Sequence, residues 1–88
     1  MSQTEIETIH NKLAHTVTEY DRQQMKKRGY NPYALGMYLG AVQDISAELT
    51  EEPRDLRRVI VNHFNGRLLD RCLKAVGLEP ATLAELRY

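Results

Sequence analysis

The chain has 88 residues, of which 42% are hydrophobic, and its 12 basic and 12 acidic side chains give a formal net charge of zero. A chain of this length forms one domain with a small core, and its apolar content is that of a folded protein. The zero net charge argues against a dedicated nucleic-acid-binding protein, while a polar N-terminus and the lack of an apolar run of about 18 residues predict a cytoplasmic protein with no membrane partner.

The first predicted helix spans residues 3–28. Ser2 with Glu5, and Thr4 with Glu7, form overlapping capping boxes at its start. Apolar residues then recur at spacings of three and four and form one face: Ile6, Ile9, Leu13, Val17 and Tyr20. Gly29 predicts a left-handed helix ending of the Schellman type, with the following tyrosine as its apolar contact.

The second predicted helix spans residues 32–49 and is the least charged part of the chain. Asn31 is placed to cap it, and Pro32 suits its first position. The expected core stripe consists of Leu35, Tyr38, Leu39, Val42, Ile45 and Leu49. Gly36 and Gly40 should each cost the helix nearly 1 kcal/mol relative to alanine, so close approach of another helix of the chain is expected there.

A second apolar strip on this helix is the strongest functional signal. It consists of Tyr33, Met37 and Ala41, with Tyr30 at the preceding corner. Tyrosine and methionine are enriched at protein interfaces, so these four residues are the predicted contact with another protein or with a second copy of the chain. The alternative is that the other helices, together with Leu83 and Leu86, cover the strip within one monomer.

The third predicted helix spans residues 53–76. Its apolar period stays in phase across Asn65-Gly66, which favours one helix, kinked at that pair. The alternative is a break, with Asn65 capping a new helix at Arg67. Gly77-Leu78 predicts another glycine ending, and a short helix over 80–87 should fold Leu83 and Leu86 onto the core. The expected fold is all-α, an antiparallel up-down-up three-helix bundle with a short C-terminal helix.

Charge is distributed unevenly along the chain. Residues 31–52 carry four acids and no base, whereas residues 53–77 carry six bases and two acids. The favoured interpretation is that the second and third helices pair along their rims, which adds little per exposed pair. The alternative is an anion-binding or nucleic-acid-binding face made of arginines: Arg54, Arg57, Arg58, Arg67 and Arg71.

The sequence predicts no catalytic site, no metal site and no cofactor. His10 and His15 are five residues apart and point to different sides of a helix, and His63 and Cys72 are no better placed to share a metal ion. Cys72 continues an apolar line with Leu68 and Val76, so it is expected in the core. The leading hypothesis is therefore a non-enzymatic protein-interaction module with an accessory or regulatory role; the alternative is a nucleic-acid-binding accessory protein.

Overall fold

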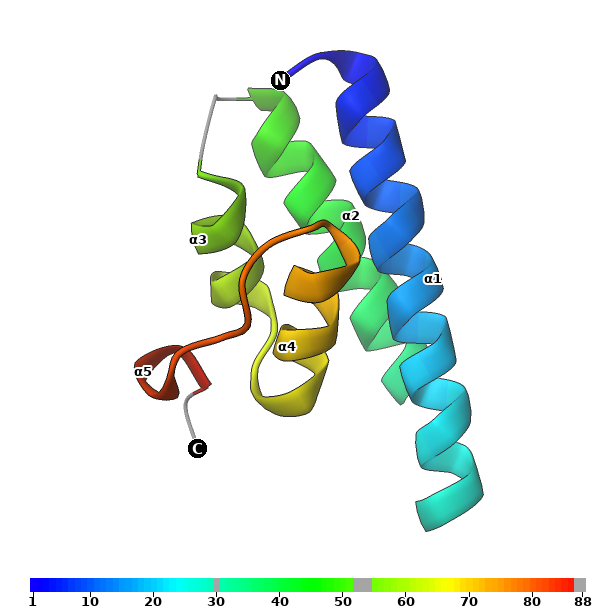
Figure 1. Ribbon diagram of the computed structural model, residues 1–88. Coiled ribbons are helices and arrows are strands. Elements are labelled where there is room, and N and C mark those ends of the chain that lie inside the picture. The colour runs from blue at the N-terminus through cyan, green and yellow to red at the C-terminus, as the bar shows by residue number, and fades with distance from the viewer. Residues whose placement is uncertain (30, 52–54, 87–88) are drawn as a thin grey trace.

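The computed structural model describes residues 1–29, 31–51 and 55–86, and every regular element in these ranges is a helix. The all-α prediction is confirmed at this level. Helices α1 and α2 lie side by side and run in opposite directions, α3 packs against α2 and α4, and α4 packs against α1 and α5 (Figure 1). The five helices are α1 (Gln3–Arg28), α2 (Ala34–Glu51), α3 (Leu56–His63), α4 (Gly66–Ala75) and α5 (Leu83–Leu86).

The predicted continuous third helix is wrong, and the break at Asn65-Gly66 is correct. Phe64 and Asn65 have extended backbones, and Gly66, the first residue of α4, has φ +58°, which the interior of a continuous right-handed helix cannot accommodate. The chain therefore turns back, so that α4 returns beside α3 (Figure 1). Asn65 occupies the N-cap position of α4 without a side-chain hydrogen bond. The predicted start of the third helix falls in residues 52–54, outside the described residues; α3 is capped by the Asp55 side chain, which accepts from the Arg57 N–H at 3.1 Å.

The core is formed by one face of each of the four longer helices. From the predicted core stripe of α2, Val42, Ile45 and Leu49 are buried, whereas Leu35, Tyr38 and Leu39 are only partly covered. The buried apolar residues are Ile6, Leu13, Val17, Val42, Ile45, Leu49, Val59, Ile60, Phe64, Leu68, Leu69, Cys72 and Leu73. The expected core position of Cys72 is confirmed, and burial raises the pKa of its thiol to about 12.

Three helix ends follow the local sequence signals, whereas Gly29 has φ +85° and ψ 175°, outside the left-handed helical region that the predicted Schellman ending requires. The capping box between Ser2 and Glu5 is formed. The Asn31 Oδ1 accepts from the Tyr33 N–H at 3.0 Å, although α2 begins two residues later than predicted. Gly77 has φ +80°, and the Leu78 N–H donates to the Leu73 carbonyl at 2.9 Å, which completes a Schellman ending. Tyr30, the expected apolar contact at the end of α1, lies outside the described residues.

Two packing expectations are wrong. An added Cβ at Gly36 or Gly40 would meet no atom of the described residues within 4 Å, so none of the five described helices approaches them closely. Leu83 is 87% exposed and does not fold onto the core, while Leu86 is partly buried. Both observations show that part of the apolar surface that the sequence assigned to intramolecular packing remains uncovered.

Among the described helices, none combines the length and apolar character that crossing a membrane requires.

Candidate functional site

The apolar strip on α2 is exposed over its first half. Tyr33 is 77% exposed and Met37 is 70% exposed, so the intramolecular alternative is wrong for these two side chains. Ala41 is partly buried against the core, and Tyr30 lies outside the described residues. We call Tyr33 and Met37 the Tyr33–Met37 strip.

The length of the neighbouring helices explains why the strip is uncovered. A continuous helix over 53–76 would extend about 36 Å, longer than the roughly 27 Å of α2. Because the chain turns back at Gly66, the helix that packs along α2 is α3, which has only 8 residues and is about 12 Å long. The last turns of α1 consequently extend beyond α4, and the first turns of α2 lie at the same end of the molecule (Figure 1).

A groove adjoins the strip where α2 meets the turn between α3 and α4. It has a volume of about 200 Å³. Its lining combines Met37 from the strip with tyrosines from two helices and with residues of the turn. The lining residues are Tyr20, Met37, Tyr38, Ala41, His63, Phe64, Asn65 and Leu68.

Two tyrosines hold α1 and α2 together beside this groove. The rings of Tyr20 and Tyr38 meet edge to face, with centroids 6.0 Å apart and planes at 74°. The Arg71 guanidinium lies 5.3 Å from the Tyr20 ring centroid, and its Nη1 donates to the Gln23 Oε1 at 2.5 Å. Arg71, predicted to bind anions, therefore connects α4 to α1.

A second hollow lies on the other side of the tyrosine pair, between the end of α1 and the start of α2. Its volume is about 270 Å³, and we call it the Asp21 pocket. Asp21 is only 7% exposed, and within the described ranges its carboxylate makes no hydrogen bond and no ion pair. The lining residues are Tyr20, Asp21, Gln24, Met25, Arg28, Gly29, Asn31, Ala34 and Tyr38.

Sequence reasoning did not predict the Asp21 pocket. The signal was present, because Leu13, Val17 and Asp21 follow one another at spacings of four residues. Leu13 and Val17 are fully buried, and Asp21, the next position on the same face, is buried as well. A charged residue at such a position needs a specific explanation.

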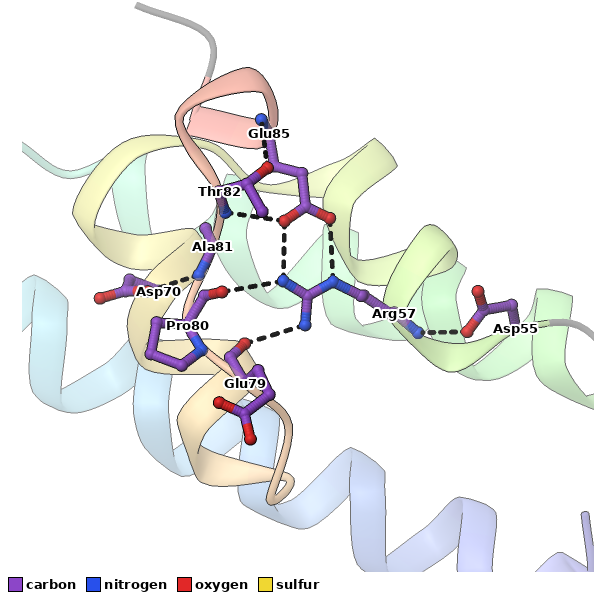
Figure 2. A network of polar contacts seen from close by, with 8 residues as sticks. All are labelled: Asp55, Arg57, Asp70, Glu79, Pro80, Ala81, Thr82 and Glu85. Carbon is purple, nitrogen blue, oxygen red and sulfur yellow. Dashed lines mark hydrogen bonds and ion pairs between the residues drawn. The ribbon is translucent and has the colours of Figure 1, made fainter.

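Arg57 is the arginine whose surroundings differ most from the prediction. Figure 2 shows its guanidinium binding the C-terminal segment: Nε and Nη2 donate to the two Glu85 carboxylate oxygens at 2.9 and 2.7 Å. Nη1 donates to the Glu79 carbonyl, and Nη2 also donates to the Pro80 carbonyl, each at 2.9 Å. Arg57 is therefore bound within the fold, by contacts that the sequence analysis did not predict.

The same network determines the ionisation of Glu85. The hydrogen bond from Arg57 and the N–H of Thr82 lower the pKa of the Glu85 carboxyl to about 2. Asp70 adds a further contact, since its Oδ1 accepts from the Ala81 N–H at 2.9 Å. These contacts attach residues 79–85 to α3 and α4.

The remaining predicted arginines do not complete a site. Arg58 and Arg67 are exposed, and Arg54 lies outside the described residues. In α2, the carboxylate of Glu48 binds the imidazole of His63 in α3. The Ser46 Oγ lies 2.8 Å from the His10 Nδ1 of α1. The described contacts of Arg57 and Arg71 go to α5 and α1, not to the acids of α2 as the rim-pairing hypothesis expected.

The protein thus presents an exposed apolar strip, a groove beside it and a pocket with a buried carboxylate, all at one end of the α1–α2 pair. Comparison of the chain with models of protein families, with curated proteins and with solved structures found no match.

Proposed function

We propose that this protein is a non-enzymatic interaction module that binds another protein through the Tyr33–Met37 strip, and that a second copy of the chain is its partner. The observation that carries the proposal is the exposure of two large apolar side chains, at 77% and 70%, one helical turn apart. Tyrosine and methionine are enriched in interfaces, and contiguous apolar surface on a small protein marks interaction sites.

The two glycines of α2 support the same surface. Gly36 follows Tyr33 by three residues, and Gly40 follows Met37 by three. The two glycines are four residues apart, as are Tyr33 and Met37, so all four lie close together on one side of the helix. The space at both glycines is open. Each glycine weakens α2 by nearly 1 kcal/mol relative to alanine, and no neighbour in the described part of the chain packs against it to offset this cost. A partner helix that packs close to the α2 backbone would offset this cost.

Charge complementarity favours a second copy as the partner. Lys26, Lys27 and Arg28 are exposed at the end of α1, beside the start of α2. Asp44 and Glu51 are exposed towards the other end of α2. A two-fold axis that pairs the α2 helices in opposite directions brings the acidic end of each copy to the basic end of the other.

The direct test is light scattering after size exclusion, over a range of protein concentration. We expect self-association that the double variant Tyr33→Ala, Met37→Ala weakens by at least about tenfold, since truncating interface anchors typically costs more than 1 kcal/mol each. Leu83→Ala is the matched control, because it removes an equally exposed apolar side chain on α5. A strict monomer at the highest concentration would overturn the second-copy version of the proposal.

A photo-crosslinking amino acid at position 37, compared with one at position 83, tests the surface with any other protein. Specific capture from position 37 alone supports the strip as the binding surface. Equal capture from both positions would contradict it. Salt-sensitive binding of DNA or RNA, lost on neutralising Arg58 and Arg67, would instead support the nucleic-acid alternative.

A further inference from the structure

Asp21 is a charged side chain at a core position without a partner. Burying a carboxylate that is neither paired nor hydrogen-bonded is strongly unfavourable, so a charged group at a core position normally has a partner, binds a ligand or keeps its charged atoms in contact with solvent. Asp21 is more than nine-tenths buried, and among the described residues no donor reaches its carboxylate. Hydrogen bonds or ion pairs with the described residues therefore do not explain why a carboxylate occupies this position.

The carboxylate faces the Asp21 pocket. Among the described residues, every buried side-chain oxygen or nitrogen that is sealed from solvent has a hydrogen-bond partner. Because the Asp21 oxygens have no partner, they must reach the solvent, and Asp21 lines the pocket of about 270 Å³. The pocket therefore offers an acceptor for a donor that enters from outside.

The walls of the pocket also suit a positive charge. Tyr20 and Tyr38 both line it, and the faces of tyrosine rings attract cations. Arg71 already lies over Tyr20. The pKa of the Tyr38 phenol is raised, first by burial and then by Tyr20 and Asp21, while the opposing influence of Arg28 is the weakest. At the Tyr38 oxygen, the negative charge of Asp21 thus outweighs the positive charge of Arg28.

We propose that the Asp21 pocket binds an alkylammonium or guanidinium group, and that a lysine or arginine side chain of the protein partner supplies it. Drug-sized ligands typically occupy roughly 300–1,000 Å³, so a pocket of about 270 Å³ fits a smaller guest such as one side chain. Tyr20 and Tyr38 line both this pocket and the groove beside the Tyr33–Met37 strip. The assignment of the cation to a side chain of the partner therefore rests on the proposed function. The binding of a cation by the Asp21 pocket does not depend on it.

Arg28 is the competing cation. It lines the pocket, yet it is exposed and forms no ion pair with Asp21 in the described structure. A guest that binds Asp21 must overcome the repulsion of this nearby guanidinium. Removing the positive charge of Arg28 should therefore strengthen binding of a cationic guest, which distinguishes a ligand pocket from an internal Asp21–Arg28 pair.

The test is a titration of the full chain, followed by amide NMR, with N-acetyl-arginine N-methylamide and N-acetyl-lysine N-methylamide as probes. We expect saturable shifts at Tyr20, Asp21 and Gly29 with at least one of these probes. N-acetyl-norleucine N-methylamide, which lacks the charge, should produce none. Asp21→Asn should weaken binding by at least about tenfold, as expected for loss of a charge-assisted hydrogen bond, and Arg28→Gln should strengthen it several-fold.

Thermal unfolding of the same variants controls for folding. Asp21→Asn removes an unpaired buried charge and should leave the melting temperature unchanged or raise it. Equal binding of the norleucine probe, or unchanged affinity in Asp21→Asn, would overturn the proposal. Tighter binding of agmatine than of the arginine probe would overturn a side chain as the source of the cation.

The Tyr33→Ala, Met37→Ala variant separates this inference from the proposed function. It should lose association while it binds the capped probes with wild-type affinity. Loss of probe binding in that variant would contradict the assignment of the cation to the Asp21 pocket.

Discussion

At the scale of single residues, Arg57 and Asp21 are charged groups with opposite surroundings. Arg57 has four hydrogen bonds to the C-terminal segment, so its charge is used within the chain. Asp21 has no such partner among the described residues and faces a pocket. The first therefore serves structure, and the second is available to a ligand.

The ion pair between Arg57 and Glu85 predicts an acid-sensitive C-terminal segment. The pKa of Glu85 is lowered from an ordinary value of 4.5 to about 2, so its contribution to stability is complete above pH 4.5 and is lost as the pH falls towards 2. The amide resonances of Ala81 and Thr82 should therefore report detachment of the segment in that pH range.

Two variants control this experiment. Glu85→Gln should detach the segment at neutral pH and abolish its change between pH 4.5 and 2, which separates Glu85 from Asp70, the partner of Ala81. Arg57→Lys keeps the charge but cannot reach both carboxylate oxygens and both carbonyls, so it should also loosen the segment. A segment that remains attached in Glu85→Gln would contradict the role of the pair.

At the scale of elements, the turn between α3 and α4 decides how much of α2 is covered. The sequence favoured one helix because the apolar period stays in phase across Asn65-Gly66, and Phe64 and Leu68, four residues apart, are both buried. The same spacing also serves two short helices that pack against each other. The left-handed backbone of Gly66 distinguishes the two cases, and the sequence signal for it was Asn-Gly.

Alanine substitutions at glycines should therefore have opposite effects. Gly36→Ala and Gly40→Ala should each stabilise the monomer by nearly 1 kcal/mol, because both lie in a helix with open space at the added Cβ. Gly66→Ala should destabilise it by about 1–2 kcal/mol, because alanine tolerates a left-handed backbone poorly. Urea unfolding at low protein concentration measures all three.

The same glycine variants also test the interface. If a partner helix packs against the α2 backbone, Gly36→Ala and Gly40→Ala should weaken association while they stabilise the monomer. Light scattering on the variants measures the first effect. Unchanged association would show that the partner contacts only the Tyr33–Met37 strip.

At the scale of the whole molecule, stability should depend on concentration. A domain of 88 residues buries a limited core, and self-association adds stability by mass action. The melting temperature of the wild-type chain should rise with protein concentration, and that of Tyr33→Ala, Met37→Ala should not. Leu83→Ala should behave like the wild type. An equal rise in the double variant would place the interface elsewhere.

The sequence alone determined what depends on neighbours within one or two turns. Hydrogen bonds between residues close in the chain form the helices and their ends. These ends include the capping box at Ser2, the cap at Asn31 and the glycine ending at Gly77. The residues of the Tyr33–Met37 strip could also be predicted from the sequence, because the helical period determines which residues share one side of a helix.

Only the tertiary structure decided which surfaces are covered. Arg57 binds a residue 28 positions away, and the exposure of Tyr33 and Met37 depends on where the chain turns between α3 and α4. The burial of Asp21, without a hydrogen bond or ion pair to the described residues, likewise depends on α1 and α2 meeting beside Tyr38. Coverage is set by packing between segments distant in the chain, and periodicity within one helix carries no information about it.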